Sequence, residues 1–78
     1  MMGNSELKFV FLKTPQLRHK FMSHDTLNIF PVIRHEIYYA KLVEEHYEIF
    51  GRSYSGAVAI DDFNQAIQEG YVSLVIDS

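Results

Sequence analysis

The chain has 78 residues, enough for a single domain over 1–78, of which we expect residues 1–5 to be disordered. It contains no cysteine, which excludes disulfides and thiolate metal sites, and its formal net charge of -3 at pH 7 is mild. No apolar run approaches the roughly 18 residues that a membrane span needs, and the first residues lack the pattern of a secretion signal. We therefore expect a soluble, cytoplasmic domain that does not engage a membrane.

The first third of the chain predicts a strand followed by a short helix. In residues 6–14, "ELKFVFLKT", apolar side chains fall on both faces, which is typical of a strand covered on both sides. Thr14 is a good helix N-cap and Pro15 is favoured at the first helical position. A short helix is therefore expected from residue 15 to about residue 22.

The middle of the chain predicts the main helix, which runs from Pro31 to Phe50 and ends at Gly51. On a helical projection, the charged residues fall in one sector, and apolar and aromatic residues fill most of the rest. The apolar face is far wider than the ~100° stripe that a surface helix needs. This helix is therefore either the central element of the fold or has apolar surface left for a partner.

The last third predicts a short strand, a helix and a second strand. The strand covers residues 56–60, and Asp61 or Asp62 caps a helix of about two turns that Gly70 ends. Residues 71–77, "YVSLVID", alternate as a strand does.

Taken in order, these elements predict an α+β fold. Its small two- or three-stranded sheet is formed by the chain ends and packs on one long central helix and two shorter helices. A sheet of this size is marginal alone, and edge pairing between two copies would enlarge it. A homodimer is therefore one expected assembly.

The motifs that would support metal binding or catalysis are incomplete. Residues 51–63 have the outline of a calcium loop, with Gly56 at the turn and Phe63 after the last ligand, but Asp62 is the lone carboxylate at a ligand position. The four histidines form no site within one segment, and whether histidines from separate segments meet stays open. With no nucleophile elbow and no phosphate loop, we expect no enzyme, no cofactor and no metal.

The remaining hypothesis is macromolecule binding, by a regulator, adaptor or inhibitor that recognises a protein. Tyrosine is enriched in interface hot spots because it buries a large area and keeps a polar tip. The candidate partner-binding residues on the main helix and the following loop are Tyr38, Tyr39, Leu42, His46, Tyr47 and Tyr54. The alternative, that the same side chains simply fill the core, stays open.

The sequence also offers two alternatives to protein binding. The segment from residue 46 to 76 resembles a helix, a turn, a recognition helix and a wing, as in winged-helix proteins that bind nucleic acid. The residues that would serve this function are Arg18, Lys20, Asn64, Gln65 and Gln68. The acids of that recognition helix would face phosphates, so nucleic acid is the less favoured partner. The acidic surplus of residues 35–78 also fits an inhibitor that imitates nucleic acid.

Overall fold

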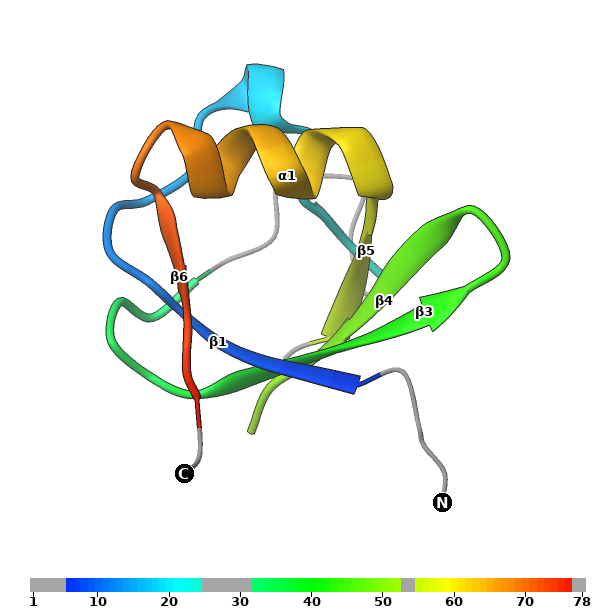
Figure 1. Ribbon diagram of the computed structural model, residues 1–78, viewed down its shortest axis with the longest axis horizontal. Helices are drawn as coiled ribbons and strands as arrows, with labels where there is room; N and C mark the ends of the chain where they lie inside the picture. Colours follow the sequence, from blue (N-terminus) through cyan, green and yellow to red (C-terminus); the bar gives the residue numbers. More distant parts are fainter. Residues whose placement is uncertain (1–5, 25–31, 53–54, 77–78) are drawn as a thin grey trace.

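A computed structural model describes residues 6–24, 32–52 and 55–76 of the chain. These residues form one antiparallel sheet of six strands with the strand order β2-β5-β4-β3-β1-β6, one α-helix and one turn of 3-10 helix (Figure 1). In chain order the elements are β1 (Glu6–Phe11), η1 (Leu17–His19), β2 (Met22–Ser23), β3 (Tyr38–Val43), β4 (His46–Phe50), β5 (Ser55–Ala59), α1 (Ile60–Gln68) and β6 (Val72–Leu74).

The predicted fold class is wrong, because the segment expected as the main helix is a β-hairpin. Strands β3 and β4 pair in register across the two-residue turn Glu44-Glu45, with Ala40 opposite Ile49 and Tyr39 opposite Phe50. Side chains therefore alternate with a period of two, and one set is buried while the other faces away from the core. The apolar residues that made the helical face too wide belong to two faces of a sheet.

The short helix expected from residue 15 to 22 is also wrong in its extent. Only one turn forms, and it ends at Lys20, whose backbone has the left-handed φ of 59°. The chain then extends, so that Phe21 enters the core and β2 pairs with β5. A left-handed residue cannot continue a right-handed helix, which explains the early stop.

The chain ends do pair as expected. Strand β1 pairs with β6, with Phe9 opposite Leu74, and β5 lies close to the predicted strand at 56–60. Helix α1 begins after Ala59, so that Asp61 and Asp62 lie in its first turn, where their charge suits the helix dipole, and neither is the N-cap.

The core lies between α1 and one face of the sheet. It is built around five fully buried rings, of which Phe9 contacts Phe11 and Phe63 edge-on at centroid distances of 5.3 and 5.2 Å. Phe21 and Tyr38 complete the cluster through Phe11. Edge-to-face packing of this kind is favourable beyond the burial of area.

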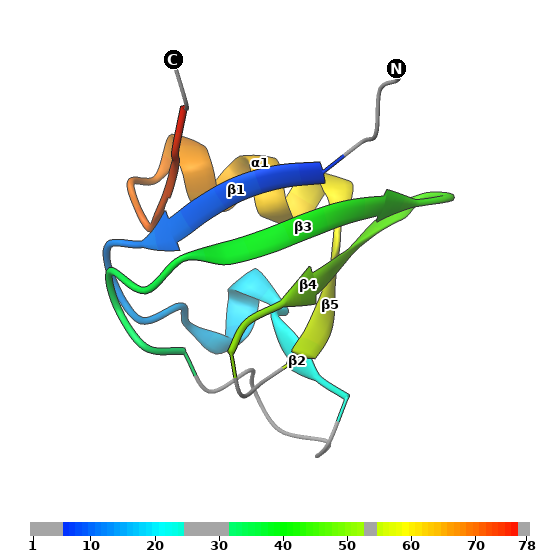
Figure 2. The same cartoon turned by 90° about the horizontal axis from the view of Figure 1, so that it is seen from below.

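The other face of the sheet has no helix on it in the described part of the chain. Seen from below, β1 and β3 lie in front and α1 lies behind them (Figure 2). The side chains that alternate with the core residues of β1, β3 and β4 therefore define an open face. We call it the open face, and its members are Glu6, Lys8, Val10, Tyr39, Lys41, Val43, His46, Glu48 and Phe50.

Candidate functional site

Two aromatic side chains lie at the middle of the open face. Tyr39 on β3 and Phe50 on β4 are direct cross-strand neighbours, and each is 43% exposed. On the other side of Tyr39, Lys8 of β1 lies in the same cross-strand row. Directly opposed side chains in a sheet are close enough to present one continuous surface. The row therefore offers an aromatic patch with the long side chain of Lys8 beside it.

A groove adjoins this patch at the margin of the sheet. It has a volume of about 370 Å³ and lies between β1, β3 and the chain after β6, where Lys8, Tyr39, Leu74 and Ile76 line it. The groove is open to solvent, which suits a docked side chain or peptide better than a reaction that needs water excluded. Tyr39 belongs to both the patch and the groove, so the two form one surface.

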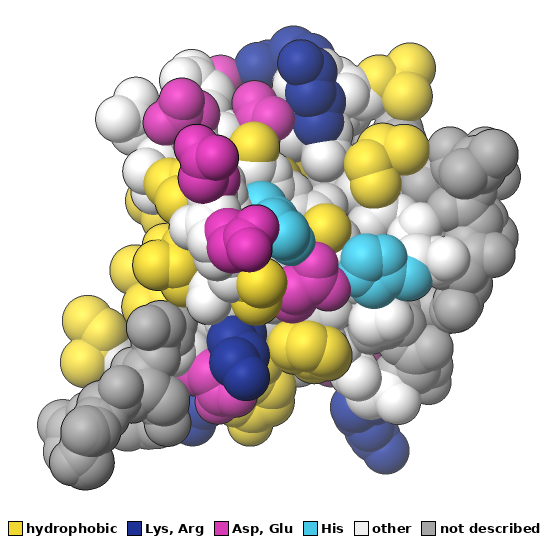
Figure 3. Space-filling model, turned by 90° about the vertical axis from the view of Figure 1, so that its right-hand side faces the viewer, with side chains coloured by type: hydrophobic (Ala, Val, Ile, Leu, Met, Phe, Trp, Pro, Cys, Tyr) yellow, Lys and Arg dark blue, Asp and Glu magenta, His cyan; other side chains and the backbone are white. Residues whose placement is uncertain are grey.

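A cluster of two histidines and a carboxylate occupies another part of the open face. Nε2 of His24 lies 2.7 Å from Oε1 of Glu48, and Nε2 of His46 lies 2.6 Å from Oε2 of the same carboxylate. Hydrogen bonds from His24, and then from His46, hold the pKa of Glu48 below its usual value. Histidine and acidic side chains adjoin on this side of the molecule (Figure 3).

This cluster answers the question that the sequence left open, since histidines from separate segments do meet. The carboxylate lies between them, so the two imidazoles donate to Glu48 and do not converge on a common point. Among the residues that the structure describes, no three His, Asp or Glu side chains are arranged to hold a metal ion. The arrangement ties the end of β2 to β4 across β5.

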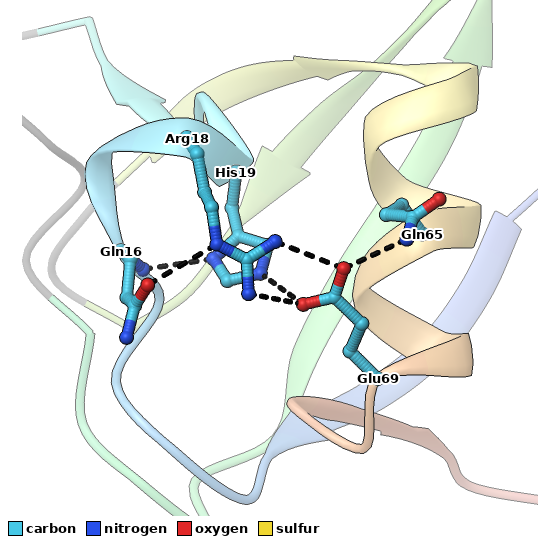
Figure 4. Close-up of polar contacts among 5 residues, drawn as sticks. All are labelled: Gln16, Arg18, His19, Gln65 and Glu69. Atoms are coloured by element: carbon cyan, nitrogen blue, oxygen red, sulfur yellow. Dashed lines mark hydrogen bonds and ion pairs between the residues drawn. The ribbon is translucent and has the colours of Figure 1, made fainter.

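A second polar cluster joins η1 to the end of α1 (Figure 4). Nη1 of Arg18 donates to Oε2 of Glu69 at 2.9 Å, and Nη2 donates to Oε1. His19, which is only 1% exposed, places Nε2 3.1 Å from Oε1 of Glu69, while its Nδ1 accepts the N–H of Gln16 at 2.8 Å. Gln65 donates to Oε2 from one turn back along α1.

The contacts of this second cluster fix η1 against the end of α1. Because Nδ1 of His19 accepts a backbone N–H, its proton is on Nε2, which donates to Glu69. Both ring nitrogens are thus engaged, and a general base needs one free for the substrate. The bidentate Arg18 contact holds the pKa of Glu69 far below its usual value, with smaller contributions from Gln65 and His19.

The residues predicted to bind a protein partner do not form one surface. Tyr39 and His46 are on the open face, whereas Tyr38 is fully buried and accepts the N–H of Ile33 at 2.9 Å. Tyr47 packs on Phe63 at a ring-centroid distance of 4.9 Å. The cross-strand neighbour of Tyr47 is Leu42, which stays exposed near the hairpin turn on the same side of the sheet as α1, and Tyr54 lies outside the described residues.

The residues predicted for nucleic-acid binding are also divided. Arg18 and Gln65 are held by Glu69, whereas Lys20, Asn64 and Gln68 are exposed. The first helix of the winged-helix hypothesis would have covered the residues of β4, which is a strand, so that part of the hypothesis is wrong.

Sequence reasoning missed Phe50 and Lys8 as members of the open face, and it missed the pairing of His24 with Glu48. The signal for Phe50 was present in "HYEIF", where apolar and polar residues alternate as in a strand with one buried face. The pairing of His24 depends on β2 lying beside β5, which no local pattern encodes.

The described residues include no helix that is both long enough and apolar enough to cross a membrane. Comparisons with protein-family models, with curated proteins and with solved structures found no match for this chain.

Proposed function

We propose that this chain is a small, non-enzymatic binding protein that docks a protein partner on the open face of its sheet. The observation that carries the proposal is the exposed cross-strand pair of Tyr39 and Phe50. Partly exposed aromatic rings on a rigid sheet are typical anchors of protein interfaces, because they bury a large area at low entropic cost.

The charges around the aromatic pair favour a protein over a nucleic acid. Lys8 and Lys41 share the open face with Glu48, and Glu6 is the cross-strand neighbour of Lys41. A polyanion would be repelled by the two carboxylates while it is attracted by the two lysines. A protein surface of mixed charge can match both signs, and this gives specificity around an apolar centre.

The groove beside Tyr39 extends the same surface toward the margin of the sheet. Leu74 and Ile76 line it with exposed apolar side chains, and Lys8 contributes its aliphatic stem. An apolar centre with a polar rim is the anatomy of a protein interface. The two histidine clusters support a role without chemistry, since Glu48 and Glu69 are both engaged by neighbouring side chains.

The proposal is tested by placing a photo-crosslinking phenylalanine analogue at position 50. The matched control carries the analogue at Leu17, which is 77% exposed on η1 and away from the open face. We expect one protein from an extract of the source organism to crosslink at position 50 and not at position 17. That protein is then purified and its affinity for the unmodified chain is measured by calorimetry.

Substitutions then show whether the crosslinked protein binds the open face specifically or was crosslinked by chance. Tyr39→Ser and Phe50→Ser should each weaken binding of the purified partner about 30-fold, as interface anchors do, whereas Leu17→Ser should leave it unchanged. Equal affinity for the wild type and Tyr39→Ser would show that the open face is not the docking site. Salt-sensitive binding of a single-stranded oligonucleotide, lost in the same two variants, would instead favour stacking of bases on the rings.

A further inference from the structure

Strand β6 is an outer strand of the sheet, and one of its two edges pairs with nothing in the described part of the chain. On its inner edge, the carbonyl of Tyr71 accepts the N–H of Leu12, and the N–H of Val75 donates to the carbonyl of Lys8, each at 2.8 Å. Backbone groups alternate in direction along an antiparallel strand. Those of Val72, Leu74 and Ile76 therefore point away from β1.

The strand at this outer edge is short, with three residues in β6, but the described residues 72–76 lack the side chains that usually block edge pairing. Residues 72–76, "VSLVI", contain no charge, no proline and no glycine, and Leu74 and Ile76 are 41% and 85% exposed. Natural proteins protect such edges by keeping the edge strand very short, or with charged residues, prolines, bulges or a covering element. An uncharged, extended edge with exposed aliphatic side chains is instead a template for another strand.

We infer that the occupant of this edge is the β6 strand of a second copy of the chain, paired antiparallel about a two-fold axis at Leu74. In this register Leu74 faces Leu74 of the second copy, and Val72 faces Ile76. Each of these pairs exchanges two backbone hydrogen bonds, which gives about six bonds between the two edges.

The edge is self-complementary because residues 72–76 carry no charge, and this favours a second copy as the occupant. At a two-fold axis every residue meets its own kind or its symmetry mate, so any charge near the axis would meet a like charge. The edge residues 72–76 carry none, and the three residues whose backbone groups would pair across the axis, Val72, Leu74 and Ile76, are all apolar. The row from Phe9 through Leu74 to the same residues of the second copy would be continuous across the interface.

The pairing would also place the two open faces on the same side of one continuous sheet, because the two-fold axis of an antiparallel pair is perpendicular to the sheet. Two Tyr39–Phe50 patches would then be available to one partner, with a corresponding gain in avidity. This inference goes beyond the proposed function and does not depend on it.

Residue-resolved amide exchange by NMR tests the inference. It is measured at protein concentrations of about 20 µM and about 1 mM, because the dissociation constant expected of a dimer with so short an interface lies between them. The amides of Leu74 and Ile76 should gain protection at the higher concentration, at least tenfold in exchange rate, and sedimentation equilibrium should show a dimer. The amides of Ser73 and Val75, which point toward β1, are the internal control and should not change.

A variant pair completes the test. Leu74→Lys places two like charges at the axis and should weaken dimerisation at least tenfold, while Leu17→Lys, on the exposed turn η1, which contacts α1 and not β6, should not change it. The variants' NMR spectra report whether the monomer fold is kept. A monomer at 1 mM, a dimer unaffected by Leu74→Lys, or protection of Leu74 and Ile76 that does not depend on concentration would each overturn the inference.

Discussion

His19 and Glu69 connect the only turn of 3-10 helix in the described residues to the end of α1. The imidazole is buried, and its Nε2 lies 3.1 Å from the carboxylate oxygen that Arg18 also contacts. The ring of Tyr71 lies against the imidazole at a centroid distance of 4.3 Å. One buried histidine therefore joins η1, α1 and the chain leading into β6.

Replacing His19 should destabilise the domain strongly, because its imidazole is buried and both ring nitrogens have hydrogen-bond partners. His19→Ala leaves a cavity beside Tyr71 and removes the acceptor of the Gln16 N–H, so we expect a loss of about 2–4 kcal/mol in the free energy of unfolding. His19→Gln can still donate to Glu69 and should recover part of the loss. Urea unfolding measures both, and equal losses in the two variants would argue against the Glu69 contact.

The carboxylate of Glu69 should make stability depend on pH in acid. Its folded-state pKa is depressed, first by Arg18 and then by Gln65 and His19, so its contribution is present above the unfolded pKa of about 4.3. The contribution is lost as the pH falls through the folded value. Glu69→Gln should therefore lower Tm at pH 7, and the difference from the wild type should shrink progressively below about pH 5.

The control for this experiment is Glu45→Gln, which makes the same change in net charge in the turn between β3 and β4. Scanning calorimetry from pH 7 to about pH 3 compares the three proteins over the range in which the unfolded carboxylate titrates. A difference in Tm between Glu69→Gln and the wild type that stays constant over this range would contradict the role given to the carboxylate.

The sequence predicted the first strand and the elements after residue 55 well. Strand β1, the short strand β5, helix α1 and strand β6 each carry a local signal, either alternation or an acidic first turn followed by Gly70. Glycine at position 70 has a φ of 82°, which explains why the helix ends there. These elements need only local information.

The middle of the chain could not be resolved from sequence, because both periods fit it. "YYAKLVEEHYEIF" has apolar residues that satisfy a helical face as well as two faces of a hairpin. The turn contains Glu44-Glu45, and glutamate favours helices, whereas hairpin turns are usually marked by Asn-Gly or Asp-Gly. Pairing within the six-stranded sheet stabilises the strand conformation of this segment, although its local propensity favours a helix.

The candidate site was predicted only in part, because a helical period was assigned to residues that form two strands. Tyr39 and His46 were named and lie on the open face, but Tyr38 and Tyr47 differ from their neighbours by one position and therefore point to the core. In a strand, a shift of one residue reverses the face, whereas a helix spreads adjacent residues over one side. A wrong period therefore mixes core and surface residues in one list.

The hairpin turn offers a stabilising substitution. Glu44 has a φ of 57°, a left-handed conformation that costs a residue with a side chain about 1–2 kcal/mol. Glu44→Gly relieves this cost and adds some unfolded-state entropy, so we expect a net gain of about 0.5–1 kcal/mol. Glu45, which is not among the residues with positive φ, provides the control, and Glu45→Gly should be destabilising. Chemical denaturation of both variants checks the sign, and a gain in both would point to relief of charge repulsion instead.

The two adjacent tyrosines of β3 should contribute very differently to stability. Tyr38 is fully buried against Phe9 and Phe11, so Tyr38→Ala should cost about 3–5 kcal/mol, enough to unfold much of a domain this small. Tyr38→Phe keeps the ring and loses only the hydroxyl that accepts the Ile33 N–H, so it should cost about 1 kcal/mol.

Tyr39→Ala should change stability by no more than about 1 kcal/mol, because the side chain lies on the open face and is 43% exposed. Denaturant unfolding of the three variants gives the comparison directly. If Tyr39→Ala proved as damaging as Tyr38→Ala, the ring of Tyr39 would be part of the core, and the open face would lose the anchor on which partner docking depends.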